Sequence, residues 1–445
     1  MKLPKLSPTK AILVGFCSII LLGTLLLCLP FATREPMTTS PLDALFTATS
    51  ATCVTGLVRF DTYTHWTLFG QLVILALIQI GGMGFMTLAI SLVSLTKRKI
   101  GLNQRVIMQE SVAAPQVGGI VRMTKFILLG TFLFEGLGAL LLCFHFCPQL
   151  GFWRGLYFSV FHSISAFCNA GFDLMGCVEP FSSLTTLYDN AYVNAIILSL
   201  IFIGGLGFFV WSDIVHSRFH FRKFKLHTKV VLFVSLLLCV CGAGLLLLFE
   251  HGGVAYEGKS FGDQVLLSAF QSIAPRTAGF NTAPLDALTQ PSQLLIACLM
   301  LIGGSPGSTA GGLKTTTFAV SLLSVFTTFR RKKSVECFKR RIDDEVVRTA
   351  FCVMIMYLSL SLVCTLIISS VENMPVLTSL FEVASAIGTV GLSLGVTPEI
   401  GAVSQIVLIL LMIFGRVGSL TILLAFTSTR QPPPTQLPTE KLQVG

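Results

Sequence analysis

Long uncharged blocks recur along the chain and are separated by shorter polar stretches. A spanning helix needs about 20 apolar residues. The blocks that approach or exceed this length cover residues 11–29, 66–96, 191–212, 230–249, 292–313 and 349–371. The first block is interpreted as a spanning helix rather than a signal peptide, because its apolar run exceeds the usual h-region and no small-x-small cleavage site follows it. The pattern predicts an all-α membrane protein with several spans.

One short motif, a run of small residues that ends in glycine, occurs four times. The copies read SATCVTGL, SAFCNAGF, IAPRTAGF and SAIGTVGL, and they end at Gly56, Gly171, Gly279 and Gly391 with one apolar residue beyond. In each copy an alanine lies five residues before the glycine, and successive glycines are 115, 108 and 112 residues apart. Four copies in register at a nearly constant spacing indicate an internal repeat.

Every copy occupies the same place in a longer plan. An apolar helix comes first, over residues 11–29, 126–146, 230–249 and 349–371. A segment too short to span a bilayer follows, over residues 42–52, 156–167, 261–274 and 376–387, and then come the glycine and a second apolar helix. We therefore expect four tandem repeats of helix, re-entrant half-helix, loop and helix, with eight transmembrane helices in a pseudo-fourfold arrangement around one pore. The predicted repeats are 1–96, 97–217, 218–333 and 334–429, and a tail covers 430–445.

The glycine-ended loops place polar backbone where the pattern predicts membrane. Non-helical backbone at that depth is tolerated only where protein buries it or where it lines a water-filled cavity. Four such loops around one axis can turn their carbonyls inward as rings of oxygen ligands for a potassium ion. The half-helices would direct the partly negative ends of their dipoles at the same point. The predicted filter comprises Cys53, Val54, Thr55, Gly56, Cys168, Asn169, Ala170, Gly171, Arg276, Thr277, Ala278, Gly279, Gly388, Thr389, Val390 and Gly391.

Composition and charge support this picture. Of all residues 53% are hydrophobic and only 12% are charged, and the net charge is +10. Basic residues are concentrated at residues 2–10, 97–125, 218–229 and 330–348. Because cytoplasmic loops of membrane proteins carry the excess of Lys and Arg, this distribution predicts that both termini are cytoplasmic. Membrane orientation explains the basic excess, so no nucleic-acid partner is expected.

The four loop sequences resemble those of the Trk/Ktr/HKT superfamily of potassium transporters. The likeness runs from about residue 11 to 426 and is greatest to KtrB-type membrane subunits of Ktr uptake systems. It implies a homodimer in the cell membrane that binds a cytosolic ring of KtrA-type nucleotide-binding subunits. Relatives with serine in place of the first filter glycine tend toward sodium, so Gly56 implies potassium. Cys53 departs from the family pattern, which has threonine there.

A glycine-rich stretch interrupts the returning helix of the third repeat. Glycine and proline weaken a helix by about 1 and 3 kcal/mol each, so the helix is expected to break here, under the filter. The resemblance identifies the stretch as an intramembrane loop, and we interpret it as a gate held by Lys314 and Arg416. The predicted gate residues are Gly303, Gly304, Ser305, Pro306, Gly307, Ser308, Thr309, Ala310, Gly311 and Gly312.

Other ionisable residues lie within the apolar blocks. Arg276 falls in the third filter loop and would repel a cation if it faced the pore. We expect it to point backward and to pair with an acid, with Glu382 as the candidate. Glu135 is expected to be a buried structural acid. A metal or disulfide role for Cys143 and Cys147 is a minor alternative.

A membrane enzyme and a coupled symporter are the two alternative functional classes. A membrane enzyme would need clustered catalytic side chains, but the histidines are dispersed and no HExxH or Walker motif occurs. His162 is expected to be a buried hydrogen-bonding residue. A sodium- or proton-coupled symporter also uses broken helices at mid-membrane, usually in inverted repeats, whereas these repeats run in one direction. The sequence leaves coupling to sodium or protons open and predicts no organic cofactor.

Overall fold

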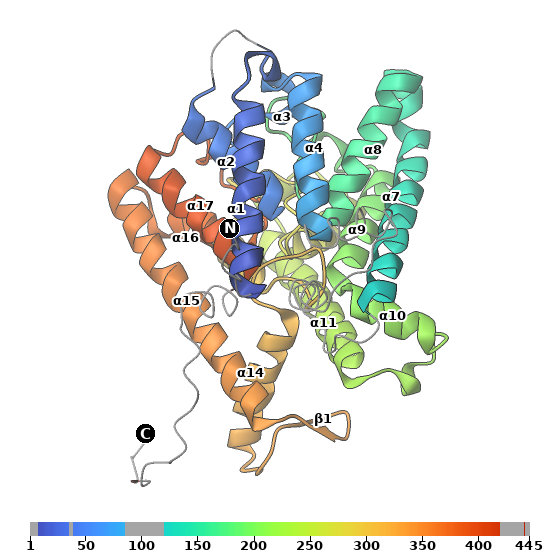
Figure 1. Ribbon diagram of the computed structural model, residues 1–445, viewed down its shortest axis with the longest axis vertical. Helices are drawn as coiled ribbons and strands as arrows, with labels where there is room; N and C mark the ends of the chain where they lie inside the picture. The colour runs from blue at the N-terminus through green and yellow to red at the C-terminus, as the bar shows by residue number, and fades with distance from the viewer. Residues whose placement is uncertain (1–7, 35–38, 85–119, 419–439, 441–445) are drawn as a thin grey trace, which may run out of the picture.

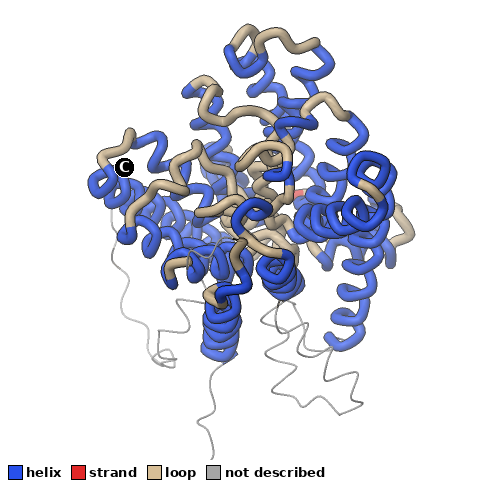
Figure 2. The backbone as a smooth tube through the Cα atoms, turned by 90° about the horizontal axis from the view of Figure 1, so that it is seen from above, coloured by secondary structure: helices blue, strands red, loops and turns tan. Residues whose placement is uncertain are grey.

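The computed structural model describes residues 8–34, 39–84, 120–418 and 440. The described part is helical apart from loops and one two-stranded hairpin. Figure 2, a view from above, shows loops gathered in the centre of the molecule with helices around them. The predicted order of long helix, half-helix, loop and returning helix is confirmed in each of the four repeats.

The first helix of each repeat is long and apolar. These helices are α1 (Pro8–Leu27), α7 (Ile120–Leu150), α11 (Leu226–Glu250) and α15 (Asp344–Glu372), and each is long and apolar enough to cross a membrane. Leucines on their outer faces, such as Leu21, Leu129 and Leu236, are more than half exposed. Contiguous exposed apolar surface of this kind is expected of helices that face lipid.

The predicted half-helices are α2 (Pro41–Cys53), α8 (Phe152–Cys168), α12 (Phe261–Ile273) and α16 (Val376–Gly388). Their starts follow ordinary capping chemistry, since Ser40 and Ser260 accept hydrogen bonds from backbone N–H groups three residues later. α2, α8 and α16 each end at a residue in the left-handed conformation, namely Val54, Asn169 and Thr389. The chain turns toward the centre there instead of continuing as a helix.

The returning helices differ from a set of four uniform spans. They are α4 (Leu68–Met83), α9 (Ala191–Leu206) with α10 (Phe208–His216), α13 (Gln290–Leu301) with α14 (Thr315–Phe329), and α17 (Ala402–Val417). The break between α13 and α14 is the predicted one. The expectation of a continuous helix over 191–212 is wrong, because α9 and α10 meet at an angle of 90°. The cause is Gly207, whose φ of 92° and ψ of 148° belong to a backbone region that essentially only glycine occupies.

Short elements complete the described chain. Figure 1 shows the loop after α10 and the hairpin after α14 at the lower end of the molecule, away from the filter loops. Arg218 and Arg330 lie in these lower connections. The short elements are η1 (Pro30–Ala32), α3 (Thr62–His65), η2 (Met175–Cys177), η3 (Thr185–Leu187), η4 (Phe221–Lys223), η5 (Val254–Tyr256), β1 (Glu336–Cys337) and β2 (Arg340–Arg341).

Polar contacts between repeats join their upper loops. Arg59 pairs with Asp43 at 3.0 Å and also donates to three backbone carbonyls of the fourth repeat, at residues 397, 398 and 400. Asp61 accepts the N–H of Phe181 in the second repeat at 3.1 Å. The N–H of Leu184 donates to the carbonyl of Asn281 in the third repeat at 3.0 Å. These bonds link repeat 1 to repeats 4 and 2, and repeat 2 to repeat 3.

Replacing Arg59 by Ala is expected to destabilise the protein by about 2 kcal/mol, since hydrogen bonds to charged groups contribute about 1.5–3 kcal/mol and the loss leaves Asp43 without its cation. The measurement is the apparent Tm of the purified protein in detergent. Lys332→Ala is the control, because its ion pair with Glu336 is exposed and such pairs contribute about 0–1 kcal/mol. Equal Tm values for the two variants would contradict the role of Arg59.

Candidate functional site

The four motif glycines form a closed ring. A Cβ added to Gly171 would lie 2.8 Å from the Cα of Gly279, and one added to Gly391 would lie 2.8 Å from the Cα of Gly56. Likewise a Cβ on Gly56 would meet Gly171, and one on Gly279 would meet Gly391. Each glycine therefore touches the next repeat in chain order, and the fourth touches the first. The loops surround one axis, as the motif predicted.

The backbone of the loops has a repeated conformation. All four glycines have positive φ, and so do the residues two positions before them. Left-handed conformations are unfavourable by about 1–2 kcal/mol for residues with a Cβ and cluster at functional sites. The non-glycine residues concerned are Val54 (57°), Asn169 (61°), Thr277 (77°) and Thr389 (51°).

Hydrogen bonds show which way the loop carbonyls face. The N–H groups of Thr55, Ala170 and Val390 donate back to carbonyls of their own half-helices at 2.8 Å. In a trans peptide the preceding carbonyl points opposite to the N–H, so the carbonyls two positions before the glycines point away from the half-helices. The carbonyl one position before each ring glycine lies against the ring glycine of the preceding repeat, and that of the first repeat lies against the ring glycine of the fourth.

These carbonyls lack a hydrogen-bond partner within the described ranges. Among hydrogen bonds between described residues, none ends on the carbonyl of a residue one or two positions before a ring glycine. Buried backbone oxygens are almost always paired. A ring of unpaired oxygens on the axis therefore has the chemistry of a cation site.

Buried side chains hold the loops from behind. Ser50 and Ser385 accept hydrogen bonds from the N–H of Gly56 and Gly391, at 3.1 and 3.0 Å. Ser165 donates to the carbonyl of Phe172 at 2.6 Å. These serines were not predicted as site residues, although the sequence carried a signal: serine occurs six positions before the glycine in three of the four copies.

Glycines of the returning helices let those helices touch the half-helix ends. A Cβ on Gly81 would overlap the carbonyl of Thr52, and one on Gly204 that of Phe167. Gly415 has the same relation to Ile387. Each of these carbonyls belongs to the residue four positions before a ring glycine. In the first, second and fourth repeats this glycine therefore sets the position of a filter loop, whereas the equivalent Gly303 of the third repeat meets the carbonyl of Gly311 in the intramembrane loop.

The intramembrane loop, residues 303–312, is closed at its base and is buried except at residues 306–308, which are partly exposed. Gly303 N–H donates to the Leu313 carbonyl at 2.8 Å, and Thr315 N–H to the Gly304 carbonyl at 3.0 Å. The loop also contacts the second repeat, since Phe208 N–H donates to Gly307 at 2.7 Å. The hydroxyl of Thr309 donates to the carbonyl of Phe167 at 3.2 Å, at the end of α8. The loop thus lies directly beside the base of the filter.

Two cations hold this loop. Arg416 donates to the carbonyl of Thr309 and, on the other side, to the carbonyls of Gly81 and Gly82 in the first repeat. Lys314 donates to the carbonyl of Ala310 at 2.8 Å. Arg416 thereby connects the fourth repeat, the loop of the third and the returning helix of the first.

The expected pairing of Arg276 with Glu382 is wrong. Arg276 does point backward, but it donates to the backbone and hydroxyl oxygens of Ser235 on α11, at 3.2 and 3.1 Å. Within the described chain no ion pair includes Arg276. Glu382 instead accepts hydrogen bonds from the hydroxyls of Ser393 and Thr397. Both bonds are local, and they support the loop after the fourth filter segment.

The remaining candidates have structural surroundings. His162 is fully buried, its Nδ1 lies 2.8 Å from the Phe158 carbonyl, and its Nε2 accepts the N–H of Leu174. The interpretation of His162 as a buried hydrogen-bonding residue is confirmed. Cys143 and Cys147 are free thiols. The described residues contain no group of three side chains suited to a metal ion.

A cavity of about 220 Å³ opens above the ring. Its lining includes the four ring glycines and the side chains of Asp61 and Asp173. Asp61 and Asp173 are the acidic residues of this lining. A cation in this cavity would stabilise their charged carboxylates, so the cavity can collect cations at the mouth of the ring.

Residues 13–433 match the family model TrkH, described as a cation transport protein. The chain belongs to this family. Members of the TrkH family transport cations and are not enzymes. The pseudo-fourfold fold agrees with a solved structure, the potassium transporter TrkH from Vibrio parahaemolyticus, with a TM-score of 0.72, 22% identity and coverage of 96% of this chain and 86% of that one.

Curated relatives match the chain over nearly its whole length. The potassium/sodium uptake protein NtpJ of Enterococcus hirae is 38% identical over 99% of this chain and 98% of its own. The Ktr system potassium uptake protein B of Bacillus subtilis is 38% identical over 97% of this chain and 95% of its own. The protein of the same name in Vibrio alginolyticus is 35% identical.

Replacing Gly81 by Ala should destabilise the protein by about 1–3 kcal/mol, the usual effect of overpacking a tight contact. The added Cβ would meet the Thr52 carbonyl and lie 2.9 Å from Val54 Cγ2. Cation flux in liposomes should fall with it, because both neighbours belong to or support the first filter loop. Gly136→Ala is the matched control, since no atom lies within 4 Å of that position. If both variants keep parental Tm and flux, close packing at Gly81 does not set the loop.

Proposed function

We propose that this protein takes up potassium across the cell membrane through the ring of loop carbonyls. The observation that carries the proposal is the closed ring of four loops with unpaired oxygens turned to its axis. The names of the full-length relatives, each a potassium uptake protein, support it. Sixteen predicted filter positions, four per repeat from residues 53, 168, 276 and 388 onward, form the proposed potassium site.

Selection of potassium over other cations depends on backbone oxygens that replace the hydration shell of the ion. Side chains of the loops face away from the axis, as the backward path of Arg276 illustrates. Cys53 in place of the family's threonine therefore changes the packing behind the ring and leaves the number of carbonyl ligands unchanged.

The proposed orientation places the basic lower connections and both chain termini in the cytoplasm. Positive-inside charge distribution supports this orientation, and with it the cavity above the ring opens outward. A monovalent cation gains about 2.3 kcal/mol per 100 mV of inside-negative potential. Uptake driven by the potential alone can then concentrate potassium.

The intramembrane loop, with Arg416 and Lys314, is proposed to gate this path from the cytoplasmic side. The loop is held by directed hydrogen bonds, among them those from the two cations to backbone carbonyls. Because the loop is rich in glycine and small side chains, a second backbone conformation is low in conformational free energy. A partner that shifts α14 would act on the anchor Lys314, and one that shifts the fourth repeat would act on Arg416.

Partners are proposed by the same reasoning. The names of two relatives as subunits of a Ktr system support association with other subunits. We assign to this protein a homodimer and a cytosolic KtrA-type nucleotide-binding ring. The exposed basic segment 330–341, which follows α14, is the proposed docking surface.

A sodium- or proton-coupled symporter is the second candidate. The observation in its favour is that the relative NtpJ is named a potassium/sodium uptake protein. Potassium uptake into liposomes with and without sodium outside, at a fixed potential, distinguishes the two. Uptake that needs sodium and generates a sodium flux in fixed ratio favours the symporter.

Replacing Gly56 by Ser should raise sodium permeation relative to potassium, on the order of tenfold, a change that corresponds to about 1.4 kcal/mol. The new Cβ would press on Ala170 and lie 3.1 Å from the Cα of Gly171, which displaces the second loop. Ion competition during uptake into potassium-deficient bacteria measures the ratio. Gly258→Ser controls for strain, because it shares the positive φ and has open space around it. An unchanged ratio in Gly56→Ser would refute the filter assignment.

Replacing Arg416 by Ser, or deleting residues 305–308, should increase potassium flux several-fold and weaken its dependence on the regulatory partner. Both changes remove contacts that keep the loop beside the filter base. Single-protein flux in liposomes, with and without the partner, is the measurement. Arg122→Ser is the control, because Arg122 is an exposed arginine of α7 outside both the intramembrane loop and the proposed docking surface. A variant that folds and transports no faster than the parent would contradict the gate.

A further inference from the structure

One packing contact recurs behind the filter and differs in charge between repeats. Gly138 of α7 and Gly242 of α11 each allow close approach to a serine of their half-helix, Ser163 and Ser272. One turn earlier on these long helices lie Glu135 and Cys239. These two positions are therefore equivalent in the second and third repeats.

Each of the two residues faces the first residue of a filter segment. The thiol of Cys168 lies 3.6 Å from Glu135 Oε1, and Arg276 Nη1 lies 3.6 Å from the sulfur of Cys239. Cys168 and Arg276 both stand three positions before their ring glycines. The charge is thus on the long helix in the second repeat and on the filter in the third.

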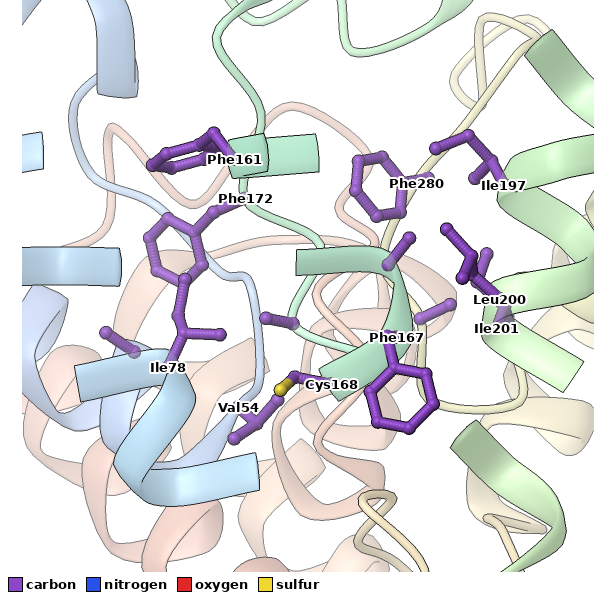
Figure 3. Packing of buried hydrophobic residues seen from close by; sticks show 14 of the residues in the cluster. Val54, Ile78, Phe161, Phe167, Cys168, Phe172, Ile197, Leu200, Ile201 and Phe280 are labelled. Atoms are coloured by element: carbon purple, nitrogen blue, oxygen red, sulfur yellow. The ribbon is translucent and has the colours of Figure 1, made fainter. Parts of the chain in front are cut away.

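Within the part of the chain that the structure describes, Glu135 accepts three hydrogen bonds and forms no ion pair. It is 5% exposed, and Gln79 of α4 donates to both of its carboxylate oxygens at 3.0 Å. The thiol of Cys168 supplies a third hydrogen bond. Figure 3 shows Cys168 on the last turn of α8, among the buried side chains behind the loops. The carboxylate therefore joins the returning helix of the first repeat to the start of the second filter segment.

Packing alone does not require a carboxylate at this place. In the first repeat the equivalent contact is apolar, since Gly23 approaches Ala48 and the preceding turn brings Ile20 into one buried cluster with Cys53. An ionisable side chain in a membrane span is unfavourable, by about 2.5–3.5 kcal/mol at mid-depth on insertion scales. Its presence in only one repeat points to a role in transport.

We propose that Glu135, held by Gln79, is a positioning residue that sets the ion discrimination of the second filter loop. Its acceptor oxygens fix Cys168, and the carbonyl of Cys168 begins the run of loop carbonyls. Cys168 also packs on Gly82, because a Cβ added to Gly82 would lie 2.8 Å from the Cβ of Cys168. The carbonyl of Gly82 accepts a hydrogen bond from Arg416 at 3.2 Å. The position of the loop is thereby tied to the anchor of the intramembrane loop. This inference rests on the proposed potassium uptake.

The test compares Glu135→Gln, Gln79→Leu and the exchange variant Gln79→Glu/Glu135→Gln in one liposome assay of competing potassium and sodium. Glu135→Gln and Gln79→Leu should each lower the ratio of potassium flux to sodium flux on the order of tenfold. The reason is that displacing a group that contacts the ion by about 1 Å changes rates by this factor or more. The exchange variant keeps one carboxylate and one amide facing each other and should restore most of the ratio.

Thr131→Val is the matched control. Thr131 is fully buried on the same helix, one turn before Glu135, and its hydroxyl has no hydrogen-bond partner among the described residues. It should change neither protein amount nor ion ratio. A parent protein that carries no potassium would refute the proposed function itself. If the parent carries potassium and Gln79→Leu and Glu135→Gln keep its ion ratio at normal protein amounts, Glu135 is a structural acid and the inference is wrong. If Glu135→Gln does not fold, the ratio in Gln79→Leu decides.

Discussion

The structure depends on one constraint: backbone polar groups inside a bilayer must be paired or must face a polar path. Each repeat ends its half-helix at mid-depth, which leaves carbonyls of the helix end and of the loop without intrahelical partners. The N–H groups turn back to the half-helix and to Ser50 or Ser385. What remains unpaired is a set of oxygens, and these are on the axis. One repeat alone would leave them in lipid, whereas four repeats enclose them.

Glycine makes this enclosure possible in two different ways. At Gly56 and its three equivalents it supplies positive φ and lets neighbouring loops meet within van der Waals contact. At Gly81, Gly204 and Gly415 the backbone is helical or nearly so, and the benefit is the absence of a Cβ against a half-helix carbonyl. The ring is therefore defined by backbone contacts, which tolerate large variation in the side chains behind it.

The repeat, the half-helices and the ring were predictable because each follows from local pattern. Spacing of the glycine motif and length of the apolar blocks depend on residues close together in the chain. The 90° bend at Gly207 was missed because GGLG reads equally well as helix-packing glycines. The hydrogen-bond partners of Arg276 and Glu135 also could not be predicted from the sequence. Ser235 and Gln79 are ordinary polar residues of apolar blocks, and only folding brings them within 3.2 Å of the charged groups.

Equivalent positions beneath the ring differ between the repeats. The motif IGG aligns Gly82, Gly205 and Gly304 with Arg416 in the fourth repeat. In the first and third repeats this position is tight: a Cβ on Gly82 or Gly304 would lie 2.5 Å from a neighbouring side chain. In the fourth repeat the guanidinium of Arg416 instead donates hydrogen bonds to carbonyls of the first and third repeats. Four arginines at this position would crowd and charge the axis against any cation, and four glycines would remove the guanidinium that ties the loop to the returning helix of the first repeat. One arginine together with three glycines avoids both problems, so the structure beneath the ring is less symmetric than the ring.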